Sequence, residues 1–104
     1  MTDEILLGIR DGKYSLHDSL LDEFNINYLT QRIVMIVRLI AENKKAVRIL
    51  FEGVDQLSGE IAIDVKNKEI ILDFELEKPN QLKLYTTSDT SLQYTFRTIE
   101  VSWG

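Results

Sequence analysis

Residues 33–51, IVMIVRLIAENKKAVRILF, decide the fold, because they fit a pair of strands while their first half also fits a helix. A loop at Glu42, Asn43 and Lys44 would reverse the chain and bring apolar residues face to face. The resulting pairs are Leu39 with Val47, Val37 with Ile49, and Met35 with Phe51. Asn43 can supply the left-handed conformation that such a loop often needs. The pattern therefore predicts a β-hairpin with one apolar face.

A helix over residues 28–43 is the alternative for the first half of that stretch. Its apolar positions also follow a 3.6-residue period. However, five of the eight residues in 33–40 are β-branched, and such side chains lose rotamer freedom in a helix. The composition favours strands and leaves the helix open as the alternative.

Residues 60–77, EIAIDVKNKEIILDFELE, predict a second hairpin with a two-residue turn at Asn67 and Lys68. Its apolar pairs are Val65 with Ile70, Ile63 with Leu72, and Ile61 with Phe74. The same register turns the acidic residues to the other face, with Glu60 opposite Glu75 and Ala62 opposite Asp73.

Further segments in which apolar and polar residues alternate extend this pattern along the chain. Strands are expected at residues 24–28, 82–87 and 92–103, the last with a bulge near Arg97 and Thr98. Gly53 is expected to adopt a positive φ or to permit a bulge. At the N-terminus, Asp11-Gly12 predicts a short hairpin that pairs Ile9 with Tyr14 and Leu7 with Leu16, whereas residues 16–23 fit either a short helix or a loop.

These segments together predict a single β domain over residues 1–104. The expected fold is an antiparallel meander of seven or eight strands that forms a sandwich or half-barrel, with room for one short helix. A chain of 104 residues and 12.1 kDa is long enough to bury an ordinary core.

The residue composition narrows the possible environments and chemistries. The chain has no cysteine, which excludes disulfides, thiolate zinc sites and a cysteine nucleophile. The N-terminus carries acidic residues where a signal peptide would be basic. The longest apolar run, residues 33–40, is broken by Arg38 and is shorter than the roughly 20 residues of a membrane span. A cytoplasmic protein without a membrane partner is the simplest interpretation.

The net charge of −5 is unevenly distributed. Residues 1–52 carry eight acids and seven bases (net −1), whereas residues 53–104 carry nine acids and five bases (net −4). Direct nucleic-acid binding depends on clustered Lys and Arg, so it is disfavoured. A basic protein is the expected partner, because complementary potentials accelerate association.

His17 is the one histidine, and it lies in the stretch Leu16-His17-Asp18-Ser19. Catalytic triads bring together residues that are distant in sequence, so three adjacent residues are poorly placed to act on one atom. A structural turn is the favoured interpretation, and a ligand site or an enzyme that uses His17 is the alternative. Because nucleotide, hydrolase and metalloprotease motifs are also absent, neither catalysis nor a cofactor is expected.

Acidic residues that alternate along the second predicted hairpin are the candidate partner-binding residues. They are Glu60, Asp64, Asp73, Glu75 and Glu77. A solvated outer face and a patch that binds a basic protein are both open interpretations. A divalent-ion site is a third, but the spacing of a calcium-binding loop is absent, so no metal is expected. Tyr85, Tyr94 and Trp103 fit either an interface or the core.

Two short motifs resemble those of a known group of proteins. Leu16-His17-Asp18-Ser19, followed by Val47-Arg48-Ile49-Leu50-Phe51-Glu52-Gly53-Val54 and Leu57, is similar to a pattern in small all-β bacterial immunity proteins of toxin systems, including contact-dependent growth inhibition. The similarity covers residues 14–60. It implies an intracellular antitoxin that binds a cognate toxin, often a basic nuclease, and blocks its active site. A non-catalytic accessory subunit, self-associating through an edge strand, is the alternative function.

Overall fold

The computed structural model describes residues 7–9, 16, 18–40, 43–60, 69–77, 80–87 and 90–104, without the side chains of Glu69 and Glu77. Within these residues the chain is mainly β, as expected, and the paired strands are antiparallel. The strands are β1 (Leu20–Asn27), β2 (Arg32–Leu39), β3 (Lys45–Glu52), β4 (Asp55–Glu60), β5 (Glu69–Glu77), β6 (Gln81–Thr86), β7 (Ser91–Thr95) and β8 (Thr98–Trp103).

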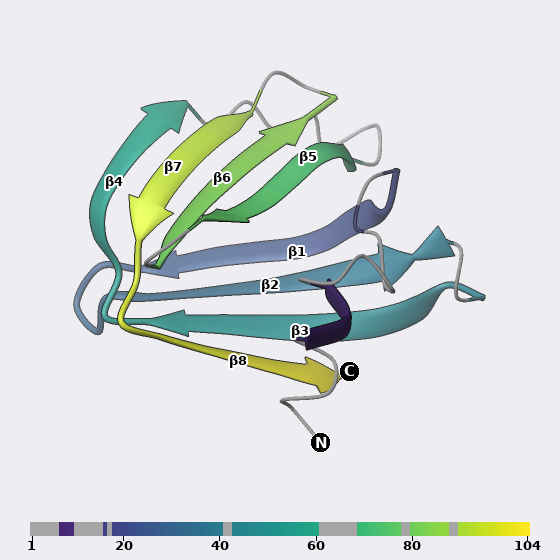
Figure 1. The fold of residues 1–104 in the computed structure, drawn as a ribbon, viewed down its shortest axis with the longest axis horizontal. Coiled ribbons are helices and arrows are strands. Elements are labelled where there is room, and N and C mark those ends of the chain that lie inside the picture. The colour runs from purple at the N-terminus through teal and green to yellow at the C-terminus, as the bar shows by residue number, and fades with distance from the viewer. Residues whose placement is uncertain are drawn as a thin grey trace.

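The strands form one open sheet that is folded over on itself. Their order is β4-β7-β6-β5-β1-β2-β3-β8. In Figure 1, β4, β7, β6 and β5 make up the upper half of the sheet, and β1, β2, β3 and β8 make up the lower half. The halves join where Leu20 pairs with Ile70 and Leu21 pairs with Glu69. The upper half is a meander of β5, β6 and β7 with β4 at its outer edge, and the lower half is a meander of β1, β2 and β3 with β8 at its outer edge.

Two bent segments connect the halves at the opposite side, where β3 continues into β4 and β7 continues into β8 (Figure 1). Gly53 lies in the first bend with a φ of 65°, which confirms its predicted left-handed conformation. Arg97 lies in the second bend and donates its backbone N–H to the Glu52 carbonyl at 2.9 Å. The single strand predicted for residues 92–103 is therefore two strands, β7 and β8. The interruption lies near Arg97, as expected, but it is a bend that carries the chain from one half to the other rather than a β-bulge within one strand.

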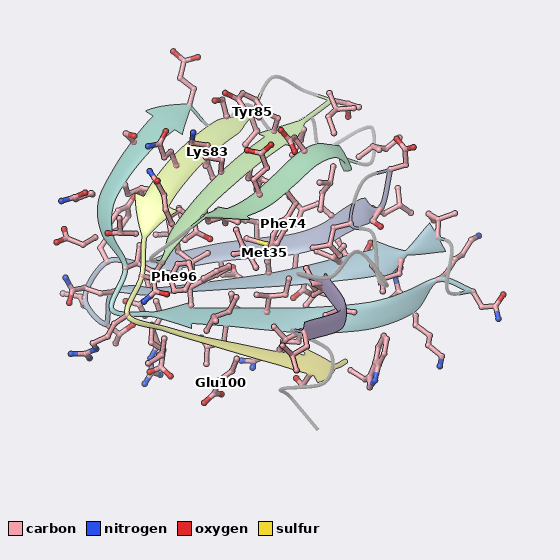
Figure 2. All side chains as sticks on the ribbon, viewed as in Figure 1. Met35, Phe74, Lys83, Tyr85, Phe96 and Glu100 are labelled. Carbon is pink, nitrogen blue, oxygen red and sulfur yellow. The ribbon has the colours of Figure 1, made fainter. Side chains whose placement is uncertain are left out.

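The core lies between the two halves, where inward-facing residues alternate with outward-facing ones. Met35, Phe74 and Phe96 project into this space in Figure 2. The ring of Phe51 packs edge-on against Tyr94 and Phe96, with centroid separations of 5.2 and 4.9 Å. The fully buried side chains are those of Ile33, Met35, Val37, Leu39, Val47, Ile49, Phe51, Ile71, Leu82, Leu84, Tyr94 and Val101.

The β2–β3 hairpin confirms the strands predicted for residues 33–51 and shows that the helical alternative is wrong. Its register differs by two residues from the predicted one, since Val37 pairs with Val47 and Leu39 with Lys45. Asn43 is left-handed as expected, but Lys44 is left-handed too, and its N–H bonds to the Leu39 carbonyl at 2.9 Å. A two-residue shift keeps every side chain on its original face, so the predicted core face is correct.

The hairpin predicted within residues 60–77 is wrong for the part of it that the structure describes. Glu60 pairs with Ser91, and Glu75 pairs with Lys83. Ile70 has Leu20 on one side and Thr87 on the other, so both of its edges face other segments. Alternating apolar strands match many partners equally well, and here the β3–β4 bend keeps β4 beside β7. Residues 61–68, with the predicted turn, lie outside the described residues.

The N-terminal expectations change as well. Residues 7–9 are helical, so the strand predicted there is wrong, and the Asp11-Gly12 turn lies outside the described residues. β1 begins at Leu20, within the stretch expected to be a short helix or a loop. Before it, Leu16 is buried against the core, which fixes the start of the sheet.

Candidate protein-binding face

The outer face of the upper half carries the acidic residues predicted to bind a partner. On β5, Phe74 and Leu76 pack toward the core, so the alternating residues Asp73 and Glu75 point outward. Their cross-strand partners on β6 are Tyr85 and Lys83, respectively. Figure 2 shows both Lys83 and Tyr85 projecting away from the interior of the fold.

The strand registers align these residues in two rows across the four strands of the upper half. In one row, Glu60 of β4 is followed by Ser91, Tyr85 and Asp73. In the next row, Ser58 of β4 is followed by Gln93, Lys83 and Glu75. Because neighbouring strands lie about 4.8 Å apart, Glu60 and Asp73 flank a surface roughly 14 Å wide with Tyr85 inside it. We call Glu60, Asp73, Glu75, Lys83 and Tyr85 the Tyr85 face.

Three of the five predicted partner-binding residues, Glu60, Asp73 and Glu75, lie on this face. Asp64 lies outside the described residues, and for Glu77 the structure describes only a backbone position opposite Gln81. The expected direct opposition of Glu60 and Glu75 is wrong, because two strands separate β4 from β5. Glu75 lies opposite a lysine instead, so the face avoids the cost of directly paired like charges.

The three aromatic candidates have three different environments. Tyr85 is 47% exposed at the centre of the Tyr85 face. Trp103 lies at the end of β8, where the Lys45 ammonium sits 5.3 Å from its ring centroid. Tyr94 is a core residue, and burial raises the pKa of its hydroxyl well above the ordinary value. Of the three, Tyr85 is therefore the one exposed beside the acidic groups.

The Leu16–Ser19 segment has a structural role at the join between the two halves. The Ser19 N–H bonds to the Leu16 carbonyl at 3.1 Å, which closes a turn with Asp18 in a left-handed conformation. The backbones of Asp18 and Ser19 each bond to that of Ile71 at 2.8 Å. This geometry supports the predicted turn, although His17 itself lies outside the described residues.

A cleft of about 190 Å³ beside the β1–β2 turn is a feature that sequence patterns missed. Arg32 and Asp55 line it, together with apolar residues such as Ile26, Val54 and Leu57. These side chains come from segments that are distant in sequence, and no motif links them. Elsewhere in the described residues, no three His, Cys, Asp or Glu side chains gather as metal ligands would.

No protein-family model matches the chain, and no curated protein matches it at a significant level. Among the described residues, no helix is both long and apolar enough to cross a membrane.

Proposed function

We propose that this chain is a binding protein that neutralises a basic partner through the Tyr85 face, as an immunity protein neutralises its cognate toxin. The observation that carries this proposal is the row in which Tyr85 lies between Glu60 and Asp73. An exposed aromatic ring flanked by carboxylates combines an anchor that loses water on binding with groups that attract cations.

The charge of the face supports a cationic partner. Its three carboxylates outnumber its one lysine, and they belong to the more acidic half of the sequence. Such a surface accelerates encounter with a positively charged protein and discriminates against acidic ones. A nuclease domain fits this description, because an enzyme that binds phosphates concentrates Lys and Arg around its active site. Binding there would exclude the nucleic-acid substrate.

The architecture supports binding on a rigid platform. The inward-facing residues of the same strands are packed in the core, including Leu82, Leu84 and Tyr94. The outward-facing residues are therefore held in place before the partner arrives, which lowers the entropic cost of association. An interface of standard size buries about 800 Å² on each partner, so the contact would extend beyond these five residues.

Co-expression with the product of the gene immediately upstream tests this proposal. We expect that product to contain a basic toxic domain, to co-purify with this chain, and to stop growth only when this chain is absent. A harmless neighbour, together with recovery of this chain alone, would contradict the proposal. It would favour the alternative of an accessory subunit with the acidic residues as a solvating surface.

A further inference from the structure

The β1–β2 turn, residues 27–31, presents two large apolar side chains to solvent at one end of the fold. Tyr28 is 78% exposed and Leu29 is 97% exposed. The Asn27 side chain fixes this turn, because its Oδ1 accepts hydrogen bonds from the N–H groups of Leu29 at 3.0 Å and Thr30 at 3.2 Å. The turn is thus a preorganised apolar projection.

The turn is also held against the bend between β3 and β4. The Val54 N–H donates to the Gln31 carbonyl at 2.9 Å. Gln31 and Gln56 both have positive φ values, 54° and 53°, although neither is glycine. Such conformations are uncommon outside glycine and cluster where function constrains the backbone. Both residues line the cleft described above, so the two uncommon conformations shape its walls.

The cleft and the projecting turn form a self-complementary surface. The cleft is lined by apolar groups of Ile26, Ile33, Val54 and Leu57, and its volume is about 190 Å³. An apolar cavity of about 150 Å³ can hold a benzene molecule, so this space is large enough for a leucine side chain. Leu29 lies next to Tyr28, which is itself a lining residue. A projection beside a recess is the arrangement that a two-fold dimer needs, because each copy offers both parts.

The charged groups of the cleft suit the same two-fold arrangement. Arg32 bonds to Glu52 at 3.2 Å, yet its side chain remains 53% exposed, and its guanidinium has further N–H donors. Asp55 is exposed, and its Oδ1 accepts the Gln56 N–H at 2.8 Å, which leaves its second oxygen able to accept. A two-fold axis at the cleft can therefore bring each Arg32 opposite the Asp55 of the other copy.

We propose that the protein forms a two-fold dimer in which Leu29 of each copy occupies the cleft of the other copy, with Arg32 facing Asp55 across the interface. This dimer goes beyond the proposed function. Its interface lies at the end of the sheet that carries the β1–β2 turn. It leaves the Tyr85 face, on the outer side of the upper half, free for a different protein.

Sedimentation equilibrium over a range of concentrations tests the dimer. The native chain should shift from 12.1 kDa toward 2 × 12.1 = 24.2 kDa. Leu29→Asp should raise the dimer dissociation constant about tenfold or more, because it places a charge in the apolar cleft. Ile40→Asp is the matched control, since Ile40 is 45% exposed, directly follows β2 at the end away from the turn, and should not affect association. A native chain that remains monomeric up to about 1 mM, or a Leu29→Asp chain that dimerises like the native one, would overturn the proposal.

Charge reversal then tests the two-fold pairing itself. Arg32→Asp and Asp55→Arg should each weaken self-association, because each creates like-charge contacts. Mixing the two variant chains should restore a dimer of one copy of each, in which both contacts pair an acid with a base. Failure of the mixture to associate more tightly than either variant alone would overturn the pairing. Thermal unfolding of each variant distinguishes lost association from lost folding.

Discussion

Gly53 contacts Arg97 where the β3–β4 and β7–β8 bends connect the two halves of the sheet, and there is no room between them for another carbon. A Cβ atom built on Gly53 would lie 2.7 Å from the Arg97 Cβ, closer than real Cβ contacts. The φ of 65° at Gly53 adds a second constraint, because side chains disfavour this conformation. The two halves of the sheet, and hence the Tyr85 face, depend on this crossing.

Replacement of Gly53 by alanine is therefore expected to destabilise the fold by about 1–3 kcal/mol. Gly104→Ala is the matched control, because the nearest atom to its added Cβ would lie 3.7 Å away, in ordinary contact. Urea unfolding followed by Trp103 fluorescence measures both changes. Equal stability of Gly53→Ala and the native protein would show that the bend tolerates a side chain.

The aromatic cluster around Phe51 is expected to dominate the stability of the core. Phe51 is fully buried and contacts Tyr94 on β7 and Phe96 in the bend that follows β7. Its truncation to alanine should cost about 3–5 kcal/mol, as removal of a large buried ring does. Ile40→Ala, at a 45% exposed position, should cost far less. Comparable losses from the two substitutions in urea unfolding would contradict the described core.

The Tyr94 hydroxyl is buried and has no hydrogen-bond partner among the described residues. Its removal in Tyr94→Phe is expected to stabilise the protein by about 1 kcal/mol, since an unsatisfied buried donor is costly. Chemical denaturation at neutral pH measures this change. A marked loss of stability would show that the hydroxyl has a partner the native fold needs.

Tyr94 also predicts an alkaline dependence of stability. Burial raises its pKa in the folded state above the ordinary value of 10.0. Above about pH 10 the unfolded chain loses this proton while the folded chain keeps it, so the unfolding free energy falls as pH rises through the folded pKa. This contribution is fully present below pH 10. The decline of the unfolding free energy at alkaline pH should therefore be smaller in Tyr94→Phe than in the native protein. Identical pH profiles of the two proteins would contradict the burial of the Tyr94 hydroxyl.

The local pattern of the sequence predicted the β class, the core face of β2 and β3, and the left-handed residues Asn43 and Gly53. These features depend on side-chain alternation and on turn chemistry, which neighbouring residues determine. Strand pairing was harder to predict, because an alternating strand can match several others. The β3–β4 bend carries Glu60 to β7 and away from Glu75.

The geometry of the candidate surfaces also depended on the long-range pairing. Acidic alternation predicted that Asp73 and Glu75 share a face, but it did not predict that Tyr85 would stand between Glu60 and Asp73. The cleft beside Leu29 required the β1–β2 turn to meet the β3–β4 bend, and that contact is a backbone hydrogen bond with no sequence signature.

Tyr85 is expected to slow dissociation of the proposed toxin partner. Tyr85→Ala should raise the dissociation rate about tenfold or more, because truncation of an aromatic anchor costs binding energy after the complex has formed. Trp103→Ala is the matched control, since Trp103 is 42% exposed in the lower half, on β8. Surface plasmon resonance measures both rates. Unchanged dissociation of Tyr85→Ala would remove the ring from the interface.

The association rate with the proposed toxin domain, measured by stopped flow at low and at physiological salt, tests the central claim most directly. The charge-reversed protein Asp73→Lys/Glu75→Lys should associate about tenfold more slowly at low salt and show a weaker salt dependence. The matched control Glu23→Lys/Glu100→Lys makes the same charge change at exposed positions on β1 and β8, and Glu100 projects from the lower half in Figure 2. It should slow association much less. An unchanged low-salt rate for the first variant, or equal slowing by both, would contradict binding through the Tyr85 face.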